Sequence, residues 1–385
     1  MRKSALCALG LVVAALVALG LVVLSSASEV RGASYFHDPM HFVKRQCVYI
    51  AVGLVAAVCA AAFDYRRWRD HWVLTAVFAA LVFAALLAVF AFPPIKGSHR
   101  WINFGPVSLQ PGEFAKIATV MIVAVWLDKA AWKVELFKTG ALWPAALVGV
   151  MAAPVLKEPD FGSVMVIAAV GFMLMYVAGT RILHMVPLAL AGAAVFVWKV
   201  AHNANRMDRI IAYIGSHADG AGASAANASG AAYQAHMSLV AIARGGITGV
   251  GLSRSMQKQN YLPEAWTDFI FAVGAEELGL VFSMCTMLLF AAFFALCIYI
   301  ALKAADRFGR LVVMGMAFII FFQAVFNIGV VCEALPTKGM ALPFFSYGGT
   351  NMVASLFAVG MIFSVGIHSL GEKRRNFLRK IIDAS

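Results

Sequence analysis

The side chains that could do chemistry gather in four polar segments of this 385-residue chain, at residues 96–116, 157–163, 233–279 and 333–350. Each segment lies between long apolar runs and mixes charged side chains with the Gly and Pro residues typical of turns. Cations beside a carboxylate that can accept a proton suit an amphiphilic substrate with a phosphate-bearing head. From the residues alone, an enzyme and a transporter both stay open.

Four basic side chains are candidate phosphate ligands. Arg100 offers a guanidinium that can bind a lipid diphosphate through two hydrogen bonds, although Arg100 and Trp101 could instead anchor a loop at the membrane interface. Arg254 and Lys258 are four residues apart, so a helix there would place both on one face. Lys338 is a compact cation that suits a phosphate or the membrane interface equally well.

Three carboxylates are candidates for acid–base work. Asp160 lies between two apolar runs and either caps the following helix or faces a water-filled cavity. Glu264 and Asp268 are four apart, after Pro263, which is well placed to begin a helix. Asp268 stands where an apolar run begins, a costly place for a charge, so it is the first candidate for catalysis. The alternative for Asp268 is a helix-start carboxylate that the helix dipole favours.

The remaining candidate substrate-binding residues lie at an expected helix start and in an expected loop. Glu113 and Lys116 are spaced i,i+3 at an expected helix start, which favours a mutual ion pair over contact with substrate. Residues 333–350 contain two prolines and three glycines, so they predict an ordered loop rather than a spanning helix. Ser346 and Tyr347 of this loop complete the set of candidate substrate-binding residues.

The composition is that of a polytopic membrane protein. Apolar residues of the AVILMFWYC set make up 62% of the chain and charged residues only 13%, which excludes a soluble domain and a disordered chain. The formal net charge of +12 is expected to face anionic lipid from cytoplasmic loops rather than nucleic acid. The six cysteines form no C-x-x-C, so neither a disulfide framework nor a cysteine metal site is predicted.

Ten continuous apolar runs predict an all-α domain, residues 1–385, with about ten transmembrane helices. The first run is long enough to be an uncleaved span rather than a signal peptide. Lys and Arg of the short connections concentrate on one side, which places both termini in the cytoplasm. The long connection between the seventh and eighth helices, residues 202–267, is then external, and residues 370–385 form a basic cytoplasmic tail. The predicted spans lie near residues 5–24, 46–63, 73–92, 112–127, 140–156, 161–178, 184–201, 268–299, 311–332 and 351–369.

The chain resembles the SEDS family of bacterial cell-wall proteins, the FtsW/RodA group. The similarity extends from SSASEVRG and DPMHFVKRQ after the first run to SLFAVGMIFSV in the last. ADRFGR and LPTKG are more similar to FtsW, the division paralogue, than to RodA, the elongation paralogue. Four stretches resemble family motifs in the family's order: RWINFGPVSLQPGEFAK, EPDFGS, YLPEAWTDFIFAVGAEELG and LPTKGMALPFFSYGGT.

The resemblance implies a ten-helix fold with cytoplasmic termini, in agreement with the topology above. It implies peptidoglycan glycosyltransferase activity on lipid II at the outer face of the bacterial cytoplasmic membrane during cell division. It also implies a class B penicillin-binding transpeptidase as partner, with other divisome membrane proteins. The family's essential carboxylate is the Asp of its T-D-F-I-F stretch, which is Asp268 in this sequence.

Four positions depart from the family pattern. Trp266 stands where a His is usual, Gly112 where a Ser is usual, His236 where Gln is common, and Glu333 where an uncharged residue is usual. The absence of the His argues against proton transfer by a side chain at position 266. The carboxylate of Asp268 is unaffected.

The expected mechanism is an inverting transfer in which Asp268 accepts the proton of the acceptor's GlcNAc 4-hydroxyl. A divalent cation, Mg²⁺ or Mn²⁺, could help to stabilise the leaving diphosphate, although no ligand set is evident. Two alternatives stay open: a lipid II flippase, which needs no base, and a non-catalytic scaffold that recruits the transpeptidase. The side chains expected to stabilise the diphosphate are Arg100, Arg254, Lys258 and Lys338.

Overall fold

Long helices account for most of the chain in a computed structural model that describes residues 2–94, 98–103, 105, 108–158, 160–202, 207, 209, 211, 213 and 230–382. Within these residues, each of the ten predicted apolar runs is helical. The helices that correspond to these runs are α1 (Arg2–Phe36), α2 (His41–Ala62), α4 (Trp72–Ala88), α5 (Pro111–Lys129), α6 (Trp143–Lys157), α7 (Phe161–Val177), α8 (Ile182–Ala201), α11 (Ile270–Leu302), α12 (Arg307–Val331) and α13 (Gly349–Ile382).

Short elements connect these helices. The strands β1 and β2 pair antiparallel, with Ile102 opposite Leu109. The long connection predicted to be external contains a helix, α10, which precedes a π-helical turn, η5. The connecting elements are α3 (Arg66–Asp70), η1 (Val89–Ala91), β1 (Ile102–Asn103), β2 (Ser108–Leu109), η2 (Ala131–Lys133), η3 (Phe137–Leu142), α10 (Gly230–Gly245) and η5 (Gln257–Tyr261).

The all-α polytopic membrane fold is confirmed. Among the described helices, eight are long and apolar enough to cross a membrane. The other two predicted spans are α7, which has 17 residues, and α5, which carries charged side chains at both ends. Because α5 packs against α4, α6, α7, α12 and α13, neighbouring helices rather than lipid cover Glu113, Lys116 and Thr119.

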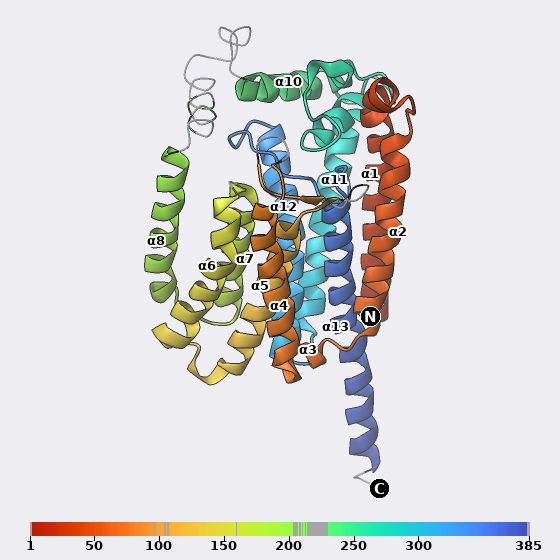
Figure 1. The fold of residues 1–385 in the computed structure, drawn as a ribbon. Coiled ribbons are helices and arrows are strands. Elements are labelled where there is room, and N and C mark those ends of the chain that lie inside the picture. The colour runs from red at the N-terminus through yellow and green to blue at the C-terminus, as the bar shows by residue number, and fades with distance from the viewer. Residues whose placement is uncertain are drawn as a thin grey trace.

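The helices form a bundle with α8 at its side (Figure 1). α8 has no buried residue, whereas α12 buries residues along its whole length. α2 packs along α13 so closely that a Cβ on Gly360 would lie 2.4 Å from the carbonyl oxygen of Ala57. Small residues therefore allow this backbone contact, as is common between membrane helices.

The start of α1 and the far end of α13 lie at one end of the bundle, and α10 lies across the other (Figure 1). The chain therefore crosses the bundle an even number of times. α13 continues as a helix to Ile382, through most of the predicted tail. At the α10 end the hydroxyl of Thr350, at the start of α13, donates to the carbonyl of Ser108 at 3.2 Å.

Candidate active site

Asp268 is half-buried in a turn two residues before α11 begins. Asn327 of α12 donates from Nδ2 to the Asp268 carbonyl oxygen at 2.8 Å and to the Met340 carbonyl oxygen at 2.6 Å. The Asp268 carboxylate lies against Gly339, where a Cβ would be 2.5 Å from Oδ2. The helix α12 therefore joins the turn to the loop 332–348, and a glycine leaves room for the carboxylate.

Glu264 shapes this turn and does not begin a helix. Its φ is +57°, in the left-handed region, and its carbonyl oxygen accepts the N–H groups of Thr267 and Asp268, both at 3.1 Å. Its carboxylate accepts the Thr267 hydroxyl at 3.0 Å. The expectation of a helix from Pro263 is wrong, because the N–H groups of Thr267, Asp268 and Phe269 all converge on the Glu264 carbonyl, whereas an α-helix pairs each carbonyl with the N–H four residues on.

Ser346 and Tyr347 attach the loop 332–348 to the same turn. The Ser346 hydroxyl is buried, accepts the Leu342 N–H at 2.7 Å and donates to the Thr267 carbonyl at 2.5 Å. The Tyr347 N–H donates to the Trp266 carbonyl at 3.0 Å. Burial raises the pKa of Tyr347, although a hydrogen bond from Arg45 opposes that rise. Their positions favour a role in holding the turn in place.

Asp160 and Lys338 lie together at the start of α7. Asp160 caps this helix by accepting the Ser163 N–H at 3.4 Å and its hydroxyl at 2.8 Å. The stem of Lys338 passes over Gly162, where a Cβ would be 3.2 Å from Lys338 Cε. Burial alone raises the pKa of Asp160, but the charges of Arg100 and Lys338 outweigh burial and lower that pKa below its usual value.

Arg100 and Glu158 belong to the same cluster. Arg100 Nε donates to the Glu158 carbonyl oxygen at 3.4 Å. The Glu158 carboxyl is buried, and its Oε1 has no hydrogen-bond partner among the described residues. Burial, reinforced by the nearby Asp160 charge, raises the pKa of Glu158 to about 8. Glu158 was missed in the sequence, where its position next to a candidate carboxylate was the available signal.

Arg209 is a second residue that sequence reasoning missed. Its Nη1 donates to the Thr337 carbonyl oxygen at 3.3 Å, one residue before Lys338. Burial lowers the pKa of Arg209, and the negative charge of Asp268 opposes that effect. The guanidinium thus faces the site from the connection between α8 and α10. A connection of that length gives no signal of orientation from its Lys and Arg residues, so Arg209 does not stand out in the sequence.

Arg254 and Lys258 do not share one helix face, which corrects the sequence expectation. Arg254 is exposed in turns before η5, and its side chain lies against Gly251. Lys258 is buried and its Nζ is 3.5 Å from Glu277 Oε1. The reason is the short η5 turn, which begins after Arg254 and directs Lys258 inwards. Of the two, only Arg254 is exposed.

Glu113 and Lys116 form the predicted ion pair inside the bundle. Lys116 Nζ is 2.7 Å from Glu113 Oε1, and both side chains are buried. Asn351 donates to the other Glu113 oxygen at 2.8 Å. The pair thus joins α5 to α13.

Trp101 is half-buried beside β1. Among the described residues, no group of three or more His, Cys, Asp or Glu side chains is placed to hold a metal ion.

Comparison with known proteins decides the family. The family profile described as cell cycle protein, FtsW/RodA/SpoVE, matches residues 7–370. The chain belongs to the FtsW/RodA/SpoVE family. It is 38% identical over 369 residues to the probable peptidoglycan glycosyltransferase FtsW of Geobacter metallireducens, covering 94% of each chain. It is also 34% identical to stage V sporulation protein E of Bacillus subtilis, covering 92% of this chain and 94% of that one.

Solved structures share the fold. A chain of a peptidoglycan synthase complex that coordinates polymerization and crosslinking is 25% identical, with a TM-score of 0.72, covering 94% of this chain and 97% of that one. The rod shape determining protein RodA of Thermus thermophilus is 26% identical, with a TM-score of 0.66, covering 93% and 95%. The coverage shows that the match extends over nearly the whole bundle.

Trp266 contacts side chains of both α1 and α2. The Arg31 guanidinium of α1 lies 5.0 Å from the Trp266 ring centroid, and the Phe42 ring of α2 lies 6.1 Å away. A cation over an indole face is an attractive contact. Position 266 therefore contributes packing to the turn of Asp268.

Proposed function

We propose that the site polymerises lipid II into glycan strands, with Asp268 as the general base. Family membership and the relatives support the reaction class: the chain is a peptidoglycan glycosyltransferase of the FtsW/RodA/SpoVE family. The observation that carries the proposal is the seating of the Asp268 carboxylate against Gly339, the neighbour of Lys338. The proposed base, Asp268, therefore lies against the residue that follows the cation Lys338 in the chain.

In the proposed reaction, Asp268 accepts the proton of the GlcNAc 4-hydroxyl of the acceptor. The hydroxyl oxygen attacks the anomeric carbon of the donor, whose bond to the diphosphate oxygen breaks, and undecaprenyl diphosphate leaves with the electron pair. The α-linked donor gives a β-1,4 linkage, so the transfer inverts the anomeric centre. A positioned general base contributes about 10²–10⁴-fold to such a step.

Basic side chains around Asp268 are proposed to stabilise the leaving diphosphate. Lys338 and Arg100 already lower the pKa of Asp160 by their charge, so their positive field reaches the site. Arg209 interacts electrostatically with Asp268 from a third side. Developing negative charge on a phosphate oxygen is stabilised best by cations that are fixed in advance.

The protein is a multi-pass membrane protein, and a homologous structure belongs to a peptidoglycan synthase complex. We place the chain in the bacterial cytoplasmic membrane, with the Asp268 end of the bundle facing outwards. Lipid II would reach the site from the membrane. The proposed partner is a class B penicillin-binding transpeptidase, together with other divisome membrane proteins, because a growing glycan must be crosslinked after it is polymerised.

Polymerisation by purified protein tests the proposal. The protein and its transpeptidase partner, with transpeptidation blocked, are incubated with lipid II, and glycan products are resolved on a gel. Wild type and Asp38→Asn, a control at a half-buried aspartate paired with the exposed Lys44, should give glycan ladders. Asp268→Asn should reduce polymerisation by about 10²–10⁴-fold while the complex stays folded.

Two results would contradict the proposal in different ways. Ladders of wild-type intensity from Asp268→Asn would move the base to another residue. A folded wild-type complex that makes no ladder would contradict the polymerase itself. The two alternative functions would then be distinguished by transport: a flippase would move lipid II across the membrane of a vesicle, whereas a scaffold would only recruit its partner.

A further inference from the structure

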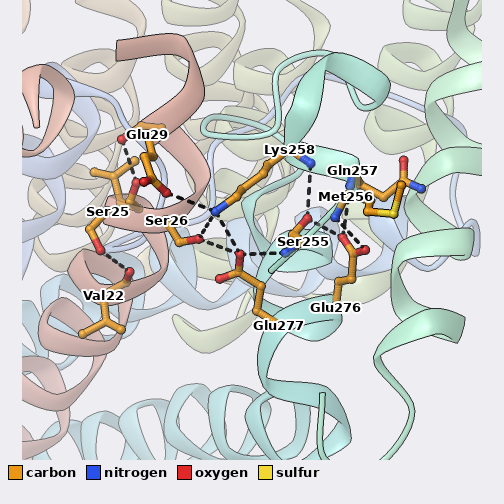
Figure 2. Close-up of polar contacts among 12 residues, drawn as sticks. Val22, Ser25, Ser26, Glu29, Ser255, Met256, Gln257, Lys258, Glu276 and Glu277 are labelled. Carbon is orange, nitrogen blue, oxygen red and sulfur yellow. Dashed lines mark hydrogen bonds and ion pairs between the residues drawn. The ribbon is translucent and has the colours of Figure 1, made fainter. Parts of the chain in front are cut away.

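A buried glutamate connects the two ends of segment 255–277, the segment that carries Asp268. Glu276 of α11 accepts the hydroxyl of Ser255 and the backbone N–H of Met256, the latter at 3.1 Å (Figure 2). Its side chain has no exposed surface. The two ends of the segment therefore meet, and Asp268 lies in the part of the chain between them.

A second buried glutamate, Glu277, attaches the same point to α1. Its Oε1 accepts the hydroxyl of Ser26 at 2.6 Å and the N–H of Ser255 at 3.3 Å. Its other oxygen, Oε2, has no hydrogen-bond partner in the described part of the chain. A buried carboxylate with one unpaired oxygen depends strongly on a neighbouring cation.

Lys258 supplies that cation. Its Nζ lies 3.5 Å from Glu277 Oε1, donates to Ser26 Oγ at 2.9 Å, and reaches Glu29 Oε2 at 3.3 Å (Figure 2). The Lys258 side chain is 3% exposed and that of Glu277 has no exposed surface, so water screens their contact little, whereas Glu29 is half-exposed. Lys258 thus joins three separate pieces of chain: α1, the η5 turn and α11.

The η5 turn leads directly into the turn of Asp268. The Leu262 N–H donates to the Gln257 carbonyl at 2.9 Å and closes η5, and Leu262 is itself buried. Glu264 begins the tight turn two residues later. A shift of Lys258 relative to α11 would therefore reach Asp268 through a short stretch of chain that Leu262 and Ala265 anchor in the core.

We propose that Lys258 is a positioning residue for Asp268. By neutralising Glu277 and binding Ser26 and Glu29 of α1, it holds segment 255–277 closed and keeps the aspartate at its place beside Gly339. Lys258 acts through this segment and does not touch the diphosphate. The inference rests on the proposed function, because it assigns the geometry of the same base.

The kinetic test compares variants of Lys258 in the complex with its transpeptidase partner. Lys258→Met should lower kcat for lipid II polymerisation about tenfold or more and leave KM nearly unchanged, since substrate contacts are kept. Lys258→Arg should restore part of kcat. Lys44→Met is the matched control, because its ion pair with Asp38 is exposed and lies outside the segment, and it should leave both constants unchanged.

A double variant keeps the proposal testable if Lys258→Met folds poorly. Glu277→Gln removes the buried charge that Lys258 neutralises, so Lys258→Met/Glu277→Gln should fold better than Lys258→Met alone. Because both residues act as one unit, its kcat should be no lower than that of either single variant. Additive losses, or a rise in KM with kcat unchanged, would overturn the proposal.

Hydrogen exchange separates this inference from the polymerase proposal. In substrate-free Lys258→Met, amides of residues 262–269 should exchange faster, while those of α12 stay as in wild type. Unchanged exchange and full kcat would overturn the positioning role and leave the polymerase intact. Faster local exchange in a protein whose wild type makes no ladder would support the closure of the segment and contradict the polymerase.

Discussion

Two carboxyl groups two residues apart, Glu158 and Asp160, differ in the protonation that their surroundings favour. Both are buried, and burial raises the pKa of each. Asp160 accepts hydrogen bonds and faces Arg100 and Lys338, which lower its pKa below the usual value. For Glu158, burial and the Asp160 charge outweigh the opposing charge of Arg100, and its pKa of about 8 leaves it mostly protonated at neutral pH. One site thus contains a carboxylate and a carboxylic acid.

Glu158→Gln should reduce the pH dependence of stability. The pKa of Glu158 in the folded protein, about 8, lies above the ordinary 4.5, so the folded protein binds this proton more tightly than the unfolded chain does. The stabilisation is complete below about pH 4.5 and is lost as the pH rises towards 8. Above pH 8 the glutamine variant should therefore have the higher Tm, by an amount equivalent to roughly a few kcal/mol at most.

Thermal unfolding of the purified proteins at a series of pH values checks this prediction. Glu135→Gln is the control, because Glu135 is exposed and paired with Arg181 at 2.6 Å. Its Tm should follow the wild-type curve at every pH. A wild-type curve that is already flat between pH 5 and 8 would contradict the raised pKa of Glu158.

The sequence singled out Asp160 and Asp268 because a charge beside an apolar run needs an explanation. It could not single out Asn327, which lies inside the run 311–332 and whose role depends on two carbonyls brought to it by folding. Lys258 was recognised as a useful cation, but its burial against Glu277 was invisible without the fold. Residue type and spacing identified candidates, whereas their partners required tertiary structure.

At the scale of elements, the loop 332–348 and the turn 262–269 behave as one unit. Ser346, Tyr347 and Asn327 bind the turn through its backbone carbonyls. The positions of the helices were predictable, because continuous apolar runs in lipid must satisfy their backbone internally. The turn was not, because Glu264 adopts a left-handed conformation that few residues other than Gly favour.

Gly339→Ala tests how closely the loop and the turn fit. A Cβ at this position would lie 2.5 Å from Asp268 Oδ2, so the carboxylate must move. We expect polymerisation to fall by roughly 10- to 100-fold, because displacement of a catalytic group by about 1 Å is costly. The Tm should change little, since Gly339 is exposed.

The matched control is Gly149→Ala in α6, where an added Cβ meets nothing within 4 Å. This variant should keep wild-type activity, measured in the same gel assay with lipid II. Full activity in Gly339→Ala would mean that the position of the Asp268 carboxylate is unimportant, which would also weaken its assignment as the base.

At the scale of the whole molecule, the arginines of α3 and the turn of Asp268 lie at opposite ends of the bundle. The end that holds the start of α1 and the far end of α13 carries α3 with its arginines, and the other end carries α10 (Figure 1). The bias of Lys and Arg predicts that the end with the termini faces the cytoplasm. Asp268 would then face outwards, where polymerisation of lipid II requires it.

Topology reporters test this orientation directly. Alkaline phosphatase, which is active only outside the cytoplasm, should be inactive when fused after Ser385 and active when fused to a chain truncated after Gly245, at the end of α10. A fluorescent protein that folds in the cytoplasm should give the reverse pattern at the same two points. The opposite result would place Asp268 on the cytoplasmic side, and polymerisation at the outer face could not occur at this site, however well its geometry suits the reaction.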